Sequence, residues 1–443
     1  MIKCFLWFVP CLFVLAGFAQ KANYKEAERF MRGNAEKLVG STKVSPHFLK
    51  ESDKFWYSYK TGDGTRYYFV DPKARIHREL FDREFMTAEI SKYTHGPVNY
   101  KELPVRALVF KEDEKTLKFE VDTFRFEYNI YTNRLVKIDS ARKKPDATPK
   151  KSNGLEGTYS PDSTYIVYAK SHNLYMLSVK DSVETQITTD GELKYSYAYG
   201  DTTSKRVSAR VTWFENSERF YVRRSDRRKI KTLYVVNNLS SRPTLNEYEY
   251  VMAGDQEVQH EELFLVDTTD KKLIKVPVEK WPDQTLRLFT PGKKVNSLYF
   301  LRKKRTCDEI DFCKVDLKTG EVKVLINEIS KPYFNNDFFH LSLLNEGEDI
   351  IWWSERTGHG HFYHYDGEGN LKNAITSGNW TAGKMVKIDT VGRTIYFGAY
   401  GQEKGACPYY ARVNKARIDG NGQVEVLTPE QATHEAYFSK SGR

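Results

Sequence analysis

The sequence predicts an all-β fold: a seven- to eight-bladed β-propeller with four-stranded blades, preceded by a signal peptide and a short N-terminal helix. Three observations lead to this prediction. Short strand-like runs, separated by Gly, Asp, Asn and Pro, fill most of the chain after residue 50. The runs recur as a loose unit of about 45 to 55 residues, which suits a propeller blade. Aromatic residues make up 14% of the chain, and such side chains suit half-buried strands.

The first 19 residues read as a targeting signal. Lys3 is followed by a short apolar stretch over residues 5–18 and by a small-x-small cleavage site at Gly17 and Ala19. The apolar stretch is too short to span a bilayer securely. We therefore expect residues 1–19 to be a signal peptide, the mature chain to start near Gln20, and the protein to be exported to the periplasm or secreted.

Two further regions follow the signal. Residues 20–50 are predicted as an N-terminal helix with a lead-in, because apolar residues recur at helical spacing over residues 22–39. Residues 51–443 are predicted as the propeller, most clearly from about residue 150. Residues 72–140 repeat poorly, so the number of blades is open by one.

The repeat is a strand, a polar turn, a strand ending in aromatic residues, a second turn and a further strand. Its clearest copy begins at Tyr159 and closes at Gly191, and a weaker one covers residues 55–71. Other copies run from Trp213 through Phe220 to residues 233–236, from Ile350 to Asp366, and from Ile388 to Leu427. One four-stranded sheet cannot bury both of its faces, whereas sheets stacked face to face can.

The formal net charge is +10, and the mature chain keeps +9 because residues 1–19 contain one Lys and no acidic residue. Basic runs at residues 142–144, 223–231 and 302–305 are interpreted as solvated faces or loops. We therefore predict no nucleic-acid partner. No cofactor is predicted either.

Three cysteines follow the signal: Cys307, Cys313 and Cys407. An oxidising compartment would permit a disulfide between Cys307 and Cys313 across a hairpin, and two free thiols are the alternative. The spacing fits no zinc pattern. His359, His361 and His364 are interpreted as a histidine cluster on a hairpin, because His364 points away from the other two in a regular strand. No metal site is predicted.

A near match to a phosphate-binding loop occurs over residues 378–384. It has Met385 where a magnesium-binding Ser or Thr should stand, and the following residues read as a strand. We interpret it as a chance match.

Several stretches resemble the N-terminal propeller of the dipeptidyl peptidase IV family of serine exopeptidases. Residues 242–255 are similar to the family's "RPTLxxYxYPxPGD" segment, and residues 353–366 are similar to its "WxSExxGxxHLYxYD" segment. Residues 379–439 resemble its last blade, from Asn379-Trp380 to Phe438-Ser439. The resemblance is specific from about residue 150 onward.

The resemblance implies an eight-bladed propeller that precedes an α/β-hydrolase domain holding Ser, Asp and His. No G-x-S-x-G motif occurs in the 443 residues, so we predict no catalytic residue in this chain and expect the hydrolase domain beyond it. Whether this chain is an enzyme by itself therefore stays open, although we expect it to be part of a serine-type dipeptidyl peptidase.

The resemblance also implies a function and partners. We expect a noncatalytic propeller that gates and positions peptide substrates for the hydrolase domain, with a homodimer as a possible state of the full enzyme. The alternative is a freestanding periplasmic propeller that binds a protein or a peptide.

Members of the family hold the substrate's amino terminus with two adjacent glutamates, through charge-assisted hydrogen bonds. The corresponding stretch here, residues 192–201, has no such pair. Glu261-Glu262 is the only Glu-Glu pair, and it opens a predicted strand elsewhere. Removal of dipeptides is therefore in doubt, and the substrate-binding residues stay unassigned.

Overall fold

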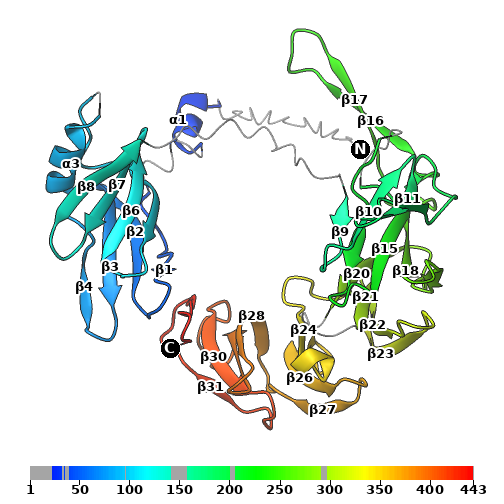
Figure 1. Ribbon diagram of the computed structural model, residues 1–443. Coiled ribbons are helices and arrows are strands. Elements are labelled where there is room, and N and C mark those ends of the chain that lie inside the picture. Colours follow the sequence, from blue (N-terminus) through cyan, green and yellow to red (C-terminus); the bar gives the residue numbers. More distant parts are fainter. Residues whose placement is uncertain are drawn as a thin grey trace, which may run out of the picture. The chain divides into compact units, whose positions relative to one another are not determined.

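The computed structural model describes residues 22–31, 34, 39–94, 96–140, 157–199, 205–290 and 297–442. The predicted signal peptide, residues 1–19, lies outside the described residues. The described part holds six four-stranded sheets, one five-stranded sheet and one two-stranded sheet, with few helices (Figure 1). None of its helices is long and apolar enough to cross a membrane.

The chain divides into two compact units, Met1–Ala147 with Tyr437–Arg443, and Thr148–Ala436. Every strand pair in both units is antiparallel. Antiparallel neighbours need only short turns, which agrees with the Gly, Asp and Asn punctuation of the sequence.

The first unit has two four-stranded sheets. The first consists of β1 (His47–Phe48), β2 (Phe55–Thr61), β3 (Gly64–Asp71) and β4 (Ile76–Glu79). The second consists of β5 (Arg106–Phe110), β6 (Thr116–Val121), β7 (Phe124–Asn129) and β8 (Arg134–Ser140). Of the poorly repeating residues 72–140, residues 106–140 thus form a four-stranded sheet of their own.

The described residues of this unit contain two helices. Within the predicted helix over residues 22–39, the described residues contain α1 (Tyr24–Arg29), while residues 32–33 and 35–38 lie outside them. The second helix, α3 (Arg83–Ser91), was not predicted. Asp82 caps it by accepting hydrogen bonds from the backbone N–H groups of Glu84 (2.9 Å) and Phe85 (3.0 Å). It buries Met86 and Ile90 in the core of the unit.

The C-terminal residues 437–442 belong to this first unit. Ser439 Oγ donates a 2.5 Å hydrogen bond to Asp53, which precedes β2. Residues from the two ends of the described chain therefore meet in one unit.

The second unit begins with the sheet of β9 (Thr158–Tyr159), β10 (Tyr165–Lys170), β11 (Asn173–Ser178) and β12 (Glu184–Gln186). Next comes the five-stranded sheet of β13 (Tyr195–Ser196), β14 (Val211–Trp213), β15 (Arg219–Asp226), β18 (His260–Asp267) and β19 (Leu273–Val276). A two-stranded hairpin, β16 (Thr232–Asn237) and β17 (Thr244–Glu249), lies between β15 and β18 in the sequence.

Three four-stranded sheets complete this unit. The first consists of β20 (Gln284–Phe289), β21 (Leu298–Lys304), β22 (Glu309–Val315) and β23 (Val322–Ile329). The second consists of β24 (Leu341–Leu344), β25 (Asp349–Ser354), β26 (His361–Asp366) and β27 (Leu371–Ala374). The third consists of β28 (Thr381–Asp389), β29 (Thr394–Tyr400), β30 (Arg412–Arg417) and β31 (Val424–Val426). A 3₁₀ turn, η1 (Asn345–Gly347), joins β24 to β25.

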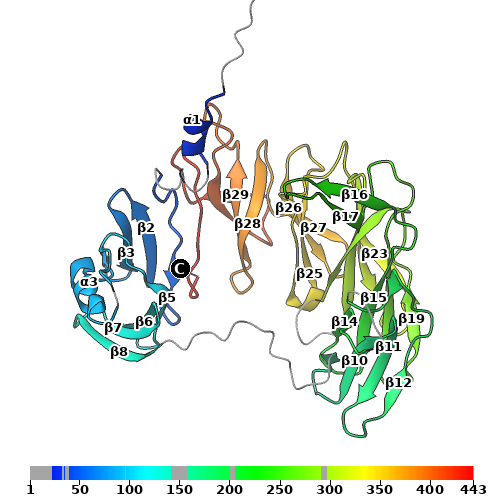
Figure 2. The same ribbon diagram turned by 90° about the horizontal axis from the view of Figure 1, so that it is seen from above.

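Successive sheets of the second unit pack face to face. Val167 of β10 shares a buried cluster with Phe220 of β15, and Leu265 of β18 shares one with Phe300 of β21. Further clusters join the sheet of β20–β23 to that of β24–β27, and the latter to the sheet of β28–β31. Figure 1 shows these sheets following one another in chain order, and Figure 2 shows the same unit turned by 90°. Stacking buries the second face of each sheet, which no single sheet can do alone.

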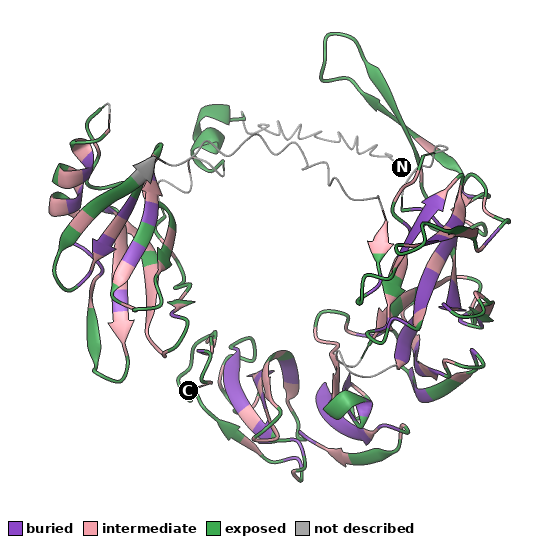
Figure 3. Ribbon diagram, viewed as in Figure 1, coloured by how far each residue is buried: buried purple, intermediate pink, exposed green. Residues whose placement is uncertain are grey.

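One strand assignment from the sequence is wrong. Residues 233–236 were predicted as the strand that follows residues 219–222 in a blade, but they lie in β16 of the two-stranded hairpin. The strand that pairs with β15 in the blade is β18, from Arg219 with Asp267 to Asp226 with His260. The hairpin is an insertion, and Figure 3 shows it exposed along its length.

Candidate functional site

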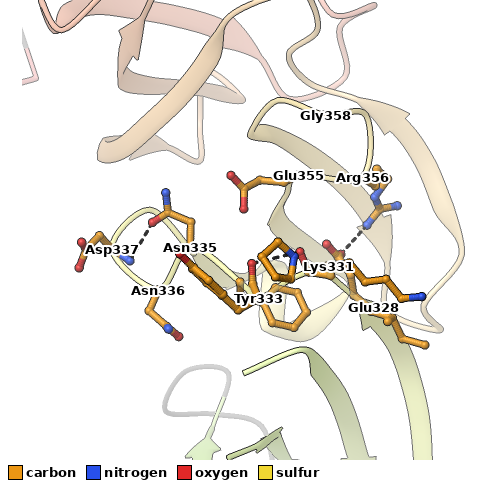
Figure 4. Close-up of a pocket in the computed structure, with 13 residues that line it drawn as sticks. Glu328, Lys331, Tyr333, Asn335, Asn336, Asp337, Glu355, Arg356 and Gly358 are labelled. Carbon is orange, nitrogen blue, oxygen red and sulfur yellow. Dashed lines mark hydrogen bonds and ion pairs between the residues drawn. The ribbon is translucent and has the colours of Figure 1, made fainter. Parts of the chain in front are cut away.

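A pocket of about 900 Å³ lies in the second unit, where two loops meet. One loop covers residues 330–337, after β23, and the other covers residues 355–358, in the turn from β25 to β26. Figure 4 shows the side chains that line it. Because both loops leave strands that are packed in the core, their ends are held in place.

Glu328, near the end of β23, forms the buried wall of the pocket. Its carboxylate accepts hydrogen bonds from Trp352 Nε1 (2.6 Å) and Ser354 Oγ (2.5 Å), both on β25. It also accepts one from Arg356 (2.9 Å). A buried carboxylate is stable only with such donors. These bonds tie the end of β23 to β25 and to the loop over residues 355–358.

Arg356 is positioned from several sides. Its Nε donates to Ser354 Oγ at 2.9 Å, and its guanidinium lies over the ring of Tyr363, 4.3 Å from the centroid. Burial disfavours its charged form, but Tyr365 and Glu328 outweigh burial and raise the pKa of Arg356. The guanidinium therefore stays charged and supports Glu328.

The loop over residues 330–337 has a buried anchor and an exposed rim. Phe334 packs in the core, and its backbone N–H donates to the carbonyl of Cys307 at 2.8 Å. Asn335 Oδ1 accepts bonds from the backbone N–H groups of Asp337 (3.1 Å) and Phe338 (3.2 Å), which closes a local turn. Tyr333 stays 64% exposed on the rim.

Asp337 and Glu355 line the pocket. Among the described residues, their carboxylates have no hydrogen-bond or ion-pair partner. Glu355 is half-buried, and its carboxylate points toward Asn335 across the pocket (Figure 4). Carboxylates and amides in a hollow beside an aromatic ring suit the amide and ammonium groups of a peptide. No histidine is among the residues that line this pocket, so Ser330 has no lining histidine to act as its base.

The Glu261-Glu262 pair lies at the start of β18, outside the pocket's lining. Its two side chains have different partners. Glu262 forms an ion pair with Arg224 (2.7 Å), while Glu261 accepts a 2.5 Å hydrogen bond from Ser225 Oγ. The pair is thus split between two networks rather than presented as one site.

The stretch over residues 192–201 lies beside the same sheet, and its residues 200 and 201 lie outside the described part. Tyr195 opens β13, and its hydroxyl donates to Glu262 at 2.9 Å. The guanidinium of buried Arg224 lies 3.7 Å from the centroid of the Tyr195 ring and binds Asp190 at 2.6 Å. These polar groups are engaged with one another in the described structure.

The predicted histidine cluster is spread along β26 and the turn before it. His361 and His364 lie on opposite sides of the sheet, as strand alternation requires, and each has its own partners. Across the described ranges, no three His, Cys, Asp or Glu side chains are arranged to hold a metal ion. Residues 386–389, which follow the near match to a phosphate-binding loop, lie in strand β28 (Thr381–Asp389), as predicted.

The disulfide between Cys307 and Cys313 is not formed, and both thiols are free. Cys307 lies in the turn between β21 and β22, whereas Cys313 lies inside β22, opposite Phe300. The extended residues from Glu309 to Cys313 alone span roughly 13 Å, more than a disulfide bridges. Burial raises the pKa of the Cys313 thiol to about 12.

The pocket was not predicted as a site. Glu355 and Arg356 belong to a segment, residues 353–366, that carried the family resemblance. Tyr333 and its loop were not singled out, because that loop stands next to Glu355 only after the two sheets have packed.

The described residues form seven sheets of four or five antiparallel strands, and successive sheets of the second unit pack face to face. This arrangement defines a β-propeller protein and confirms the predicted fold class. The model of the family described as the dipeptidyl peptidase IV N-terminal region matches residues 105–443. The chain belongs to this family.

Many solved structures are similar to the chain, and two of them come from dipeptidyl peptidases. The crystal structure of Porphyromonas gingivalis dipeptidyl peptidase 4 matches with a TM-score of 0.50 and 18% identity, over 90% of this chain and 55% of that one. A protein described as a dipeptidyl aminopeptidase IV from Bacteroides ovatus matches with a TM-score of 0.48 and 16% identity, over 91% of this chain and 56% of that one. The chain thus spans a little over half the length of either.

Proposed function

We propose that this chain is the noncatalytic propeller region of an exported serine peptidase of the dipeptidyl peptidase IV type. Its role is to gate and position peptide substrates for an α/β-hydrolase domain encoded beyond residue 443. The observation that carries the proposal is the family match over residues 105–443. The lack of a G-x-S-x-G motif in the 443 residues agrees with a noncatalytic role.

The pocket supports the part of the proposal that concerns peptides. Its volume of about 900 Å³ suits a short peptide segment. Glu355 and Asp337 offer carboxylates to cationic or amide donors, and Tyr333 offers an exposed ring. The Glu328–Arg356 ion pair keeps the pocket's wall rigid.

Peptide binding to the purified chain tests this role. We expect a Gly-Pro-containing peptide to bind, and Tyr333→Ala and Glu355→Gln each to weaken binding about tenfold, a typical loss for one aromatic or charged contact. Tyr409→Ala is the matched control, because Tyr409 is 84% exposed and does not line the pocket. Isothermal titration calorimetry measures the affinities. Equal affinities of all four proteins would exclude the pocket from peptide binding.

Catalysis is tested separately. We expect the 443-residue chain to leave Gly-Pro chromogenic substrates uncleaved. Cleavage by the purified chain would overturn the noncatalytic assignment.

Export is supported by the predicted signal over residues 1–19. N-terminal sequencing of the mature protein checks it, with a start near Gln20 in the periplasmic or secreted fraction as the expected result. An intact Met1 in the cytoplasmic fraction would contradict it.

A homodimer of the full enzyme is part of the proposal. The β16–β17 hairpin supports it, because Tyr234, Val236 and Leu245 on one of its faces are each more than half exposed. Exposed apolar side chains of this kind favour association. Sedimentation of the full protein measures the oligomeric state.

The alternative function is a freestanding periplasmic propeller that binds a protein or peptide partner. The gene downstream of codon 443 separates the two. An open frame that continues into a G-x-S-x-G motif with later Asp and His supports the peptidase, and a stop codon at position 444 supports the alternative.

A further inference from the structure

The charged side chains that line the pocket divide into a paired set and a free set. Glu328 and Arg356 form an ion pair at 2.9 Å, and their charges cancel. The other charged lining residues are Lys331, Asp337 and Glu355. Two carboxylates against one ammonium leave an excess of negative charge in the hollow. A ligand therefore meets a pocket whose uncommitted charge is negative.

Lys331 does not neutralise these carboxylates. It is exposed, and no ion pair joins it to Asp337 or Glu355 in the described part of the chain. Figure 4 shows its side chain extending away from the Glu355 carboxylate. Glu355 is half-buried, so its charge faces the pocket with less water around it than the charge of exposed Asp337 has.

The amide oxygens of the pocket are already used. Asn335 Oδ1 accepts hydrogen bonds from two backbone N–H groups of its own turn. Asn336 Oδ1 accepts a 2.6 Å hydrogen bond from Lys303 Nζ. The strong acceptors that are left for a ligand are the carboxylates of Glu355 and Asp337, and a carboxylate binds a cationic donor more strongly than a neutral one.

An aromatic ring stands at the rim of the same pocket. Tyr333 is 64% exposed, and no cation lies over its ring among the described residues. The ring of Tyr363, in contrast, is already covered by Arg356 at 4.3 Å. A ring at the rim and a half-buried carboxylate inside suit a cation at the end of an apolar stem, because the ring contacts the stem and the carboxylate takes the charge.

We propose that this pocket binds the basic side chain of a lysine or an arginine in a peptide, with Glu355 as its main charge partner and Tyr333 against its stem. The inference rests on the proposed peptide-binding role and adds a substrate class to it: peptides that carry a basic residue. Asp337 supplies a second, weaker attraction. An N-terminal ammonium is attached directly to the backbone and has no stem to pass Tyr333, which makes it the less suitable cation.

A series of peptides tests the preference on the purified 443-residue chain. The peptides are N-acetylated and C-amidated Gly-Pro-Xaa-Pro-Gly, where Xaa is lysine, norleucine or glutamate. Norleucine keeps the stem and lacks the charge. By isothermal titration calorimetry we expect the lysine peptide to bind about tenfold more tightly than the norleucine peptide, and the glutamate peptide to bind most weakly. Equal affinities for lysine and norleucine would overturn the proposal.

The same series distinguishes the two sources of a peptide cation. Acetylation removes the N-terminal ammonium, so a preference within the series comes from the side chain. A norleucine peptide with a free amino terminus is the comparison, and we expect it to bind no more tightly than its acetylated form. If the free amino terminus gave the tenfold gain and lysine gave none, the proposal would be wrong.

Variants assign the preference to the pocket. Glu355→Gln should reduce the ratio of lysine to norleucine affinity from about tenfold to about twofold, and Asp337→Asn should reduce it by about twofold, as expected for an exposed charge. Glu215→Gln is the matched control, because it removes the same charge from an exposed residue outside the pocket's lining. An unchanged ratio in Glu355→Gln, or an equal loss in the control, would contradict the assignment. Should a variant fail to fold, the peptide series on the wild-type chain still decides the preference.

Failure of this inference can be told apart from failure of the proposed function. If all three peptides bind equally and Tyr333→Ala weakens all of them, the pocket binds peptides without regard to charge, and only the inference is wrong. If none of the peptides binds, the peptide-binding role fails and the inference fails with it.

Discussion

The β25–β26 and β16–β17 hairpins are alike in sequence and opposite in environment. All four strands have six residues and carry aromatic side chains, and β16, β17 and β25 also carry β-branched ones. Every residue of β25 is buried, whereas only Leu233 of β16 is even half-buried (Figure 3). The composition of a strand therefore does not determine whether it is buried. The sheets on both sides of a strand determine it.

The contacts of the two hairpins show the difference in detail. Trp352 and Trp353 of β25 pack into two different cores, one on each face of the sheet. Tyr234 and Val236 of β16 stay 59% and 63% exposed. A two-stranded hairpin is marginally stable by itself, so the second one depends on its attachment to the blade.

Truncation of a central aromatic residue should give the largest effect. Trp352→Ala should lower the free energy of unfolding by about 3–5 kcal/mol, because it leaves a cavity and removes a donor from buried Glu328. Tyr234→Ala should change it by about 0.5 kcal/mol or less. Urea unfolding measures both. Similar losses in the two variants would contradict the contrast between the hairpins.

Overpacking of the same hairpin should have the next largest effect. A Cβ at Gly360 would lie 2.1 Å from the ring of Trp353, which is held by a 2.7 Å hydrogen bond to the carbonyl of Ala382. Gly360→Ala should therefore lower the free energy of unfolding by about 1–3 kcal/mol. Gly62→Ala is the matched control, since a Cβ there meets open space. A shift of the urea midpoint in the control alone would refute this account of the packing.

Acid should weaken the β25–β26 hairpin through Asp349. The pKa of this carboxyl is lowered to about 2, against about 3.9 in an unfolded chain. A lowered folded-state pKa means that the stabilisation is complete above about pH 5 and is lost as the pH falls toward 2. We expect Asp349→Asn to be less stable at pH 6 by about 1–2 kcal/mol and to lose less on acidification. The free energy of unfolding is measured against pH for the wild-type chain and for Asp349→Asn. Parallel profiles would contradict the link between stability and the Asp349 carboxyl.

Shortening the exposed hairpin should have the smallest effect on stability. Replacing residues 234–247 by Asn-Gly keeps the Leu233–Tyr248 pair and allows a two-residue turn. The free energy of unfolding should change by about 0.5 kcal/mol or less, because few buried contacts are removed. Sedimentation of the same variant shows whether the hairpin holds copies of the full protein together. A large loss of stability would show that the hairpin supports the blade.

Much of the fold could be predicted from the sequence. The copies from Tyr159, Ile350 and Ile388 became sheets, because turn residues and alternating strands are local signals. Helix α3 was not predicted, although Asp82 is a good N-cap. The helix has few apolar residues, and they are buried against strands that are distant in the sequence. The candidate site was not predicted as a pocket. Only Glu355 and Arg356 lie in a segment that the sequence analysis had singled out, because that segment resembles a motif of a known family.

The sequence by itself determined the repeated strands, the family and the lack of a G-x-S-x-G motif, because each of these is a local pattern along the chain. Only the tertiary structure decided that residues 233–236 leave the blade, that Cys307 and Cys313 stay apart, and which loops form the pocket. It also gave His361 and His364 different partners on one strand. The physical reason is that burial, pairing and protonation depend on neighbours that packing brings from distant parts of the chain.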